Sequence, residues 1–293
     1  MPIARYDDVA DFYLAGWRDH YSDPVSVSLF DLLGPLRGAR VLDLACGHGR
    51  ITRELARRGA GVVGLDLSGV LLDRARALDA VEPLDITYIQ GDASSQSILE
   101  AEVFDSVVCS FGLSDIDDLD GVTCTVARVP APTGRFVFAL LHPCFGGGRD
   151  VSASWPSSGS YYDEGWWVAD GALSGLRRQV GANHRMLSTY FNTLCRHGLV
   201  IDCVNEPRPP DDWSHQRPEA ARLPTFLVAR ARPLPELVEG RRRGRVAVAS
   251  GRRYPQPGGT PPKDHHRSRD SGSRRSSRCH APPGTLVNFG ETG

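Results

Sequence analysis

The chain has 293 residues, which is enough for one large α/β domain or two small ones with a substantial core. Its formal net charge is −1, but residues 234–293 carry 12 Arg or Lys and 5 Asp or Glu, so the part before them is acidic. Such a domain lacks the charge of a protein that tracks nucleic-acid phosphates. We therefore expect no nucleic-acid partner for residues 1–233.

The seven cysteines occur singly, without the C-x-x-C spacing that holds zinc or performs redox chemistry. We expect no metal site. Residues 1–8 contain no apolar signal region, and no run approaches the roughly 18 apolar residues of a membrane span. These features predict a cytoplasmic protein with no membrane partner.

Aromatic residues gather in residues 6–33, where they recur as on one face of a helix that is followed by a second, shorter helix. A core-facing stripe is the simplest interpretation. Gly34-Pro35 ends this segment.

Residues 40–56, RVLDLACGHGRITRELA, predict a strand, a tight loop and a helix. Gly47 and Gly49 permit a turn that side chains would obstruct. Unpaired backbone N–H groups at a helix start are ready donors, so we expect a ligand at this turn.

Two kinds of cofactor use such a turn at the end of the first strand of a doubly wound sheet. A dinucleotide fingerprint requires a third glycine where this chain has Thr52. Asp43, just ahead of the turn, would repel a pyrophosphate but suits an ammonium group, which S-adenosylmethionine carries. Residues 43–49, DLACGHG, resemble the first motif of the class I S-adenosylmethionine-dependent methyltransferases, although Ala45 stands where many members have glycine.

The resemblance covers residues 40–142 well and residues 183–233 loosely. It implies an α/β fold: a doubly wound, Rossmann-like, mostly parallel seven-stranded sheet with helices on both faces. It implies that S-adenosylmethionine contacts Asp43, Ala45, Gly47 and Gly49. In this family N-terminal helices often close over the cofactor, so the resemblance also implies contacts from Tyr13 or Trp17.

A second buried strand, residues 62–66, ends in Asp66, which lies 19 residues beyond Gly47. At this spacing a carboxylate reaches the ribose hydroxyls of a nucleotide on the first turn. Helix capping is the alternative role, for which Ser68 is also available. Leu67, next to this strand end, belongs to the predicted cofactor site.

The third and fourth predicted strands, residues 86–90 and 104–111, end at the same edge of the sheet. The first is followed by Gly91-Asp92-Ala93, which resembles the adenine-contacting motif of the family. Asp92 would then accept from the exocyclic amine of adenine, and a turn aspartate is the alternative. Ala93 and Ser110 complete the predicted cofactor set.

A turn over residues 130–134 leads to a fifth strand, residues 135–142, and to His142 at its carboxyl end. Methyl transfer is an in-line displacement on an activated carbon, so alignment matters most and no fixed catalytic triad is required. His142 is the candidate catalytic base, and a structural role is the alternative. Asp115 is a weaker candidate.

Residues 143–182 interrupt the α/β rhythm with glycine- and serine-rich runs and a concentration of aromatic residues at Trp155, Tyr161, Tyr162, Trp166 and Trp167. A long loop rich in aromatic residues predicts a cap over the substrate side of the sheet. Its candidate substrate contacts are Tyr162 and Trp166, with His184 just after it. The alternative is that Trp166 and Trp167 plug the core.

Residues 183–198 predict a helix with an Asn183 cap, followed by closing strands at 199–204 and 225–230. Residues 234–293 are rich in Pro, Gly, Ser and Arg and predict a disordered tail.

The sequence as a whole predicts a methyltransferase domain over residues 1–233 that uses S-adenosylmethionine to methylate a small-molecule acceptor. Two alternatives are an S-adenosylmethionine-binding regulator without activity and an NAD-dependent oxidoreductase.

Overall fold

A computed structural model describes residues 2–15, 21–101, 103–146, 154–156, 159–169, 175–209 and 222–234. Apart from Leu234, the predicted tail lies outside the described residues, as does Trp17.

Seven strands form the main sheet: β1 (Arg40–Leu44), β2 (Gly61–Asp66), β3 (Thr87–Gln90), β4 (Phe104–Ser110), β5 (Pro130–Leu141), β8 (Leu199–Asn205) and β9 (Phe226–Pro233). Their order is β3-β2-β1-β4-β5-β9-β8. Neighbouring strands from β3 to β5 are parallel, and β9 is antiparallel to both β5 and β8. The predicted mostly parallel, seven-stranded Rossmann-like sheet is confirmed.

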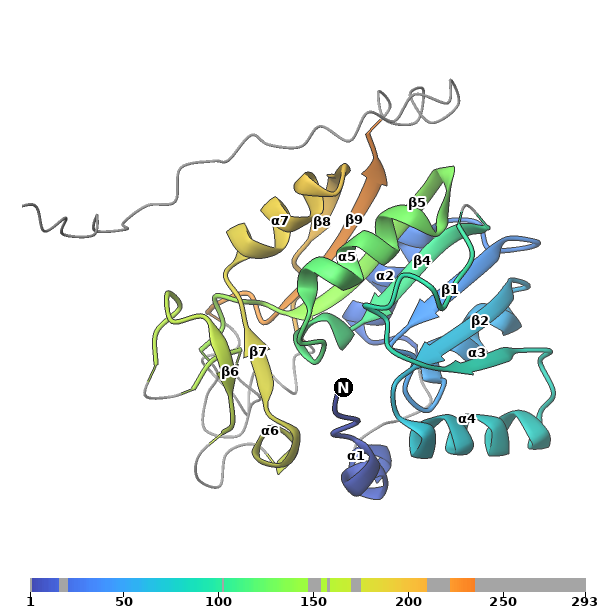
Figure 1. Cartoon of the computed structure of the whole chain (residues 1–293), viewed down its shortest axis with the longest axis horizontal. Helices are drawn as coiled ribbons and strands as arrows, with labels where there is room; N and C mark the ends of the chain where they lie inside the picture. Colours follow the sequence, from blue (N-terminus) through green and yellow to red (C-terminus); the bar gives the residue numbers. More distant parts are fainter. Residues whose placement is uncertain are drawn as a thin grey trace, which may run out of the picture. The chain divides into compact units, whose positions relative to one another are not determined.

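The helical elements are η1 (Asp7–Val9), α1 (Ala10–Ala15), α2 (Pro24–Leu33), α3 (Arg50–Arg57), α4 (Gly69–Val81), η2 (Gly112–Ser114), α5 (Leu119–Arg128), α6 (Gly175–Val180) and α7 (Leu187–Arg196). Figure 1 shows α5 and α7 in front of the sheet and α2 behind it. Among the described residues, no helix combines the length and the apolar character needed to cross a membrane.

The core lies on both faces of the sheet because successive strand residues point to opposite faces. Val41 and Val137 pack with α2 and α3, whereas their neighbours Leu42 and Phe138 pack with α5 and α7. All four side chains are fully buried. A strand covered on both faces is apolar throughout, and the runs in β1 and β5 have this character.

The predicted turn over residues 130–134 is wrong, because β5 already begins at Pro130. Phe104 pairs with Pro130, and the next pair joins Ser106 to Arg135. The extra residues form an irregularity within the strand, as β-bulges do at sheet edges and strand starts.

The predicted Asn183 helix cap is also wrong. Helix α7 begins at Leu187, and its cap residue Met186 makes no side-chain cap bond. Asn183 instead belongs to strand β7 (Ala182–His184), and its side-chain amide donates to Asp117 Oδ1 at 3.0 Å. The Asn183 amide, whose hydrogen-bonding capacity favoured the cap assignment, therefore bonds to Asp117 and not to the backbone of α7.

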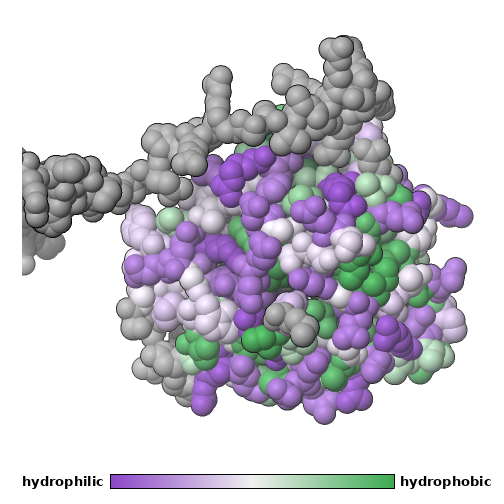
Figure 2. All heavy atoms as spheres, viewed as in Figure 1, coloured by the Kyte–Doolittle hydropathy of each residue, from purple (hydrophilic) through white to green (hydrophobic). Residues whose placement is uncertain are grey.

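The predicted cap region contains a second, two-stranded sheet in which β6 (Gly165–Trp167) pairs antiparallel with β7. Figure 1 shows this ribbon together with α6 and α1 on the side of the sheet where the parallel strands end. Hydrophilic residues cover much of the face seen in Figure 2, and hydrophobic ones form smaller groups between them.

Candidate functional site

A cavity of about 880 Å³ lies at the carboxyl ends of the parallel strands, where the strand order reverses between β1 and β4. Ligands of doubly wound folds bind at this switch point. Its size is that of a small-molecule site. Seven of the nine predicted cofactor residues line it: Ala45, Gly47, Asp66, Leu67, Asp92, Ala93 and Ser110.

The two glycines of the first turn have different roles. Gly47 lines the cavity with φ of +57°, and a Cβ added there would lie 3.5 Å from the Tyr13 hydroxyl, which lines the same cavity. Gly49 is the N-cap residue of α3 with φ of +82°, and its added Cβ would lie 2.8 Å from the Tyr88 hydroxyl. Gly47 thus keeps the cavity open, whereas Gly49, which is not among the lining residues, permits close packing behind it.

Ala45 also has a left-handed backbone, with φ of +57°. This conformation is costly for a residue with a Cβ and free for glycine. The departure noted in the sequence, alanine where many family members have glycine, therefore falls at a position whose backbone favours glycine.

Asp66 connects the turn to the second strand. Its carboxylate accepts from the backbone N–H of Gly47 at 2.7 Å and from that of Ser68 at 2.8 Å. Ser68 is the cap of α4, because its hydroxyl accepts from Leu71 N at 3.0 Å. Burial raises the pKa of Asp66 to about 6. The capping task belongs to Ser68, and the Asp66 carboxylate is left on the cavity wall.

Asp43 lies behind the turn and not on the cavity wall. It is 1% exposed, and its carboxylate accepts from the Thr52 hydroxyl at 2.6 Å. Burial raises the pKa of Asp43 to about 7. Thr52, which stands where a dinucleotide fingerprint has glycine, is therefore the donor that satisfies this buried acid.

Asp92 lines the cavity and also forms a local turn. Its two carboxylate oxygens accept from Ser94, one from the backbone N–H at 2.9 Å and the other from the hydroxyl at 2.7 Å. Both interpretations drawn from the sequence therefore have a structural basis at this residue.

His142 is 2% exposed and is not among the residues lining the large cavity. Its Nδ1 accepts from Cys144 N at 3.1 Å, which leaves the proton on Nε2, 3.0 Å from Glu206 Oε1. Burial lowers the pKa of His142. Both ring nitrogens are engaged in the protein, which favours the structural role over the catalytic one.

The three predicted substrate residues do not line the large cavity. Tyr162 is 78% exposed and Trp166 is 44% exposed. His184 is buried, and its Nε2 lies 2.9 Å from the Tyr161 carbonyl oxygen. Trp167, in contrast, is buried as the core-plug alternative expects.

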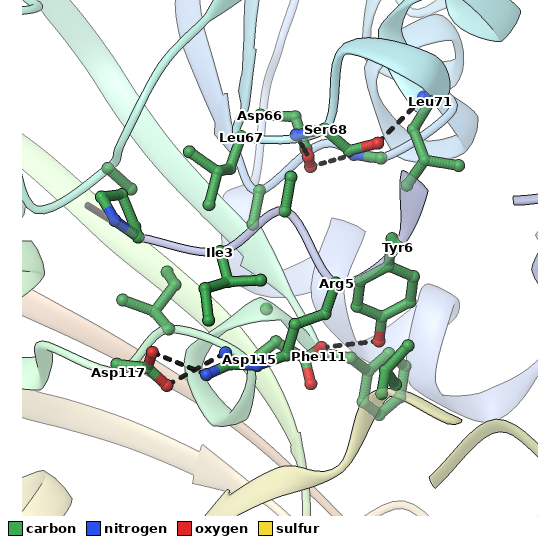
Figure 3. Close-up of a pocket in the computed structure, with 18 of the residues that line it drawn as sticks. Ile3, Arg5, Tyr6, Asp66, Leu67, Ser68, Leu71, Phe111, Asp115 and Asp117 are labelled. Atoms are coloured by element: carbon green, nitrogen blue, oxygen red, sulfur yellow. Dashed lines mark hydrogen bonds and ion pairs between the residues drawn. The ribbon is translucent and has the colours of Figure 1, made fainter. Parts of the chain in front are cut away.

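A polar cluster of Tyr6, Asp115 and Arg177 lines the opposite end of the cavity. Arg177 is buried and forms an ion pair with Asp115 Oδ1. The Tyr6 hydroxyl donates to Asp115 Oδ2 at 2.9 Å, as Figure 3 shows. Burial raises the pKa of Tyr6 well above its usual range, so the hydroxyl stays protonated. We call this cluster the Asp115 end, and the part around Ala45, Gly47 and Asp66 the glycine-turn end.

Residues 2–7 cross the cavity as a strap (Figure 3). Asp7 accepts from the Ser68 hydroxyl at 2.5 Å on one side. Arg5 donates to both Asp117 carboxylate oxygens, at 3.1 and 2.8 Å, on the other. Its guanidinium also lies 4.0 Å from the centre of the Trp166 ring, a cation–π contact. Trp166 thus holds the strap and does not itself reach the cavity.

The sequence indicated Asp115 only weakly and gave no signal for Arg177, which lies in the irregular insertion. Tyr6 belonged to the aromatic stripe without a separate role. Among the described residues, no group of three His, Cys, Asp or Glu side chains could hold a metal ion.

Comparison with known proteins decides the family. Residues 42–138 match a family described as a methyltransferase domain. A crystal structure of an S-adenosylmethionine-dependent methyltransferase from Mesorhizobium loti is 31% identical, with a TM-score of 0.58, over 72% of this chain and 98% of that one. The chain belongs to the S-adenosylmethionine-dependent methyltransferases.

Curated relatives of this methyltransferase match over a shorter stretch. A ubiquinone biosynthesis O-methyltransferase from Hahella chejuensis is 32% identical over 42% of this chain and 52% of its own length. A demethylmenaquinone methyltransferase from Renibacterium salmoninarum is 33% identical over 50% of this chain and 62% of its own length. The chain thus spans about half to three fifths of the length of these relatives.

The glycine-turn end fits the cofactor of this family. Gly47 leaves space that a Cβ would fill, and the Asp66 carboxylate can accept from ribose hydroxyls. Leu65, Leu67 and Ala93 offer an apolar wall for adenine.

Proposed function

We propose that this methyltransferase transfers a methyl group from S-adenosylmethionine to a small-molecule acceptor. The observation that carries the proposal is the single cavity that joins the glycine turn and Asp66 to a separate polar cluster at Asp115. One end suits the cofactor, and the other leaves room for a second molecule. The cofactor contacts of Asp43, Ala45, Gly47, Gly49, Asp66, Leu67, Asp92, Ala93 and Ser110 are part of this proposal, with Asp43 and Gly49 acting from behind the turn.

When bound, S-adenosylmethionine supplies a methyl group on a positively charged sulfur, which is activated for displacement. The chain's own task is to hold the acceptor in line with that group, and such alignment contributes about 7–11 kcal/mol in well-oriented reactions. Asp66 and the Gly47 backbone orient the cofactor. The strap covers the cavity and excludes water, which strengthens the polar interactions within it.

The size and lining of the cavity support a small organic acceptor. Phe111, Leu141, Val180 and Phe226 form apolar walls around the few polar groups at the Asp115 end. Small-molecule sites have this combination. The names of the two curated relatives, both connected with quinone biosynthesis, also support an acceptor of this size.

The test is to incubate the chain with S-adenosylmethionine and a panel of phenols, amines and thiols while measuring S-adenosylhomocysteine by mass spectrometry. We expect formation of S-adenosylhomocysteine that depends on one class of acceptor and that falls at least tenfold in Asp66→Ala.

A regulator that binds S-adenosylmethionine without transferring its methyl group is the second candidate. The observation in its favour is the left-handed backbone of Ala45, which strains the turn at a position where many family members have glycine. Calorimetry together with the turnover assay separates the two candidates: tight binding of S-adenosylhomocysteine with no acceptor-dependent turnover would support the regulator.

A further inference from the structure

The Tyr6 hydroxyl donates to the Asp115 carboxylate, which could otherwise accept a hydrogen bond from a ligand in the cavity. Asp115 lies just beyond η2, and its side chain is 23% exposed, whereas the side chain of its partner Arg177 is 7% exposed. Arg177 engages Oδ1, and Tyr6 donates to Oδ2. The second oxygen therefore faces the cavity and holds a hydroxyl group that comes from the strap.

Arg177 positions this carboxylate through its ion pair with Oδ1. It also donates to the Gly181 carbonyl oxygen at 2.8 Å, which fixes the guanidinium within the cap region. A carboxylate oxygen beside apolar side chains accepts strong hydrogen bonds from O–H donors. The Asp115 end is thus a built site for a hydroxyl group.

The surroundings of Tyr6 suit an aromatic ring. The Tyr6 ring meets the Tyr13 ring edge to face, with ring centres 5.1 Å apart. Phe111 and Phe226, which form another edge-to-face pair at 6.0 Å, line the same cavity. Aromatic walls of this kind select planar rings.

Phe111 adds an independent sign of function. Its backbone is left-handed, with φ of +64°, a conformation that is rare for a bulky residue. Such strain persists where the surrounding structure imposes it, and it concentrates at binding and catalytic sites. The strained residue lies at the end of β4, at the entrance to the Asp115 end.

We propose that Asp115 is the acceptor-binding residue, that the acceptor carries an aromatic hydroxyl group, and that the Tyr6 hydroxyl holds its position until the acceptor displaces it. This inference rests on the proposed function and names its substrate class. The Tyr6 hydroxyl makes the hydrogen bond to Asp115 that the acceptor's hydroxyl would make. Binding of the acceptor therefore requires Tyr6 to release Asp115.

The experiment measures binding and not turnover. The full chain is saturated with S-adenosylhomocysteine and titrated by calorimetry with catechol. A parallel titration uses 1,2-dimethoxybenzene, which has the same ring and oxygens but no O–H donor. Three variants are compared with the unmodified chain: Tyr6→Phe, Asp115→Asn and, as a control, Asp73→Asn, an exposed acid of α4 that does not line the cavity.

In Tyr6→Phe the ring remains but the competing hydroxyl is gone. We expect catechol to bind about 3- to 10-fold more tightly, the equivalent of one hydrogen bond, with no change for 1,2-dimethoxybenzene. Asp115→Asn should weaken catechol binding at least tenfold, and Asp73→Asn should change it less than twofold. Tyr6→Phe leaves the Arg177–Asp115 pair intact, so it stays informative if Asp115→Asn does not fold.

Unchanged or weaker catechol binding in Tyr6→Phe would overturn the inference. An equal gain for both probes would overturn it too, because it would mean that the strap had merely loosened. The proposed function has a separate point of failure, since S-adenosylhomocysteine binding is measured first, before either probe is added.

Discussion

At the glycine-turn end of the cavity, the Asp66 carboxylate bonds to backbone N–H groups of its own β–α–β unit. At the Asp115 end, polar side chains bond to one another across three segments that are far apart in the chain. The backbone N–H donors of Gly47 and Ser68 lie in the same β–α–β unit as Asp66. Local structure therefore preorganises the glycine-turn end. The other end exists only when the strap, the β4 exit and α6 come together. The first end therefore depends on one short stretch of the chain, and the second on three distant ones.

The largest effect is expected at Arg177. In Arg177→Met the Asp115 carboxylate keeps its place in an apolar wall without its charged partner, and breaking such a pair typically costs about 3–5 kcal/mol. Because Asp115 is partly exposed to the cavity, we expect a loss of about 3 kcal/mol in the free energy of unfolding, measured in urea. Arg178→Met, one residue along and exposed, is the control. Equal, small losses in both variants would mean that the Asp115 end adds no stability.

A second effect concerns pH and the acid behind the glycine turn. The folded chain holds the Asp43 proton up to a pH of about 7, whereas the unfolded chain releases it at about 3.9. Since the folded state binds more protons between these values, this group lowers the free energy of unfolding as pH rises from 4 to 7.

Asp43→Asn should remove that contribution and give a flatter pH dependence, measured by urea unfolding at pH 5 and pH 7 without cofactor. Asp73→Asn, an exposed acid of α4, is the matched control and should follow the unmodified chain. Parallel pH profiles for all three proteins would argue that Asp43 titrates normally in the folded state.

The smallest effect is expected at Ala45. In Ala45→Gly the left-handed backbone no longer carries a Cβ, and we expect a gain of about 1 kcal/mol in the free energy of unfolding. Ala77→Gly, at an exposed position in α4, should instead lose about 1 kcal/mol, because helical glycine is unfavourable. Losses of the same size at both positions would show that the turn does not strain Ala45.

The difference between the two ends also explains what the sequence could predict. The strands of the sheet follow from local apolar runs and turn residues, and the glycine turn and Asp66 follow from one spacing within about 30 residues of the chain. Tyr6, Asp115 and Arg177 are more than 60 residues apart from one another, and nothing in their local sequence links them.

His142 and Asn183 show the same limit in another form. The local sequence predicts a catalytic base for His142, at a strand end, and a helix cap for Asn183. In the structure each side chain bonds to a residue far away in the sequence, His142 to Glu206 and Asn183 to Asp117. Local patterns indicate what a residue can do, and the long-range contacts decide what it does.

The central claim is that the glycine-turn end binds the cofactor, and calorimetry with S-adenosylhomocysteine tests it most directly. Asp66→Ala should lose about 1.5–3 kcal/mol of binding free energy, the usual contribution of hydrogen bonds to a charged group, while the exposed acid variant Asp73→Ala binds like the unmodified chain. Undiminished affinity in a folded Asp66→Ala protein would contradict the account.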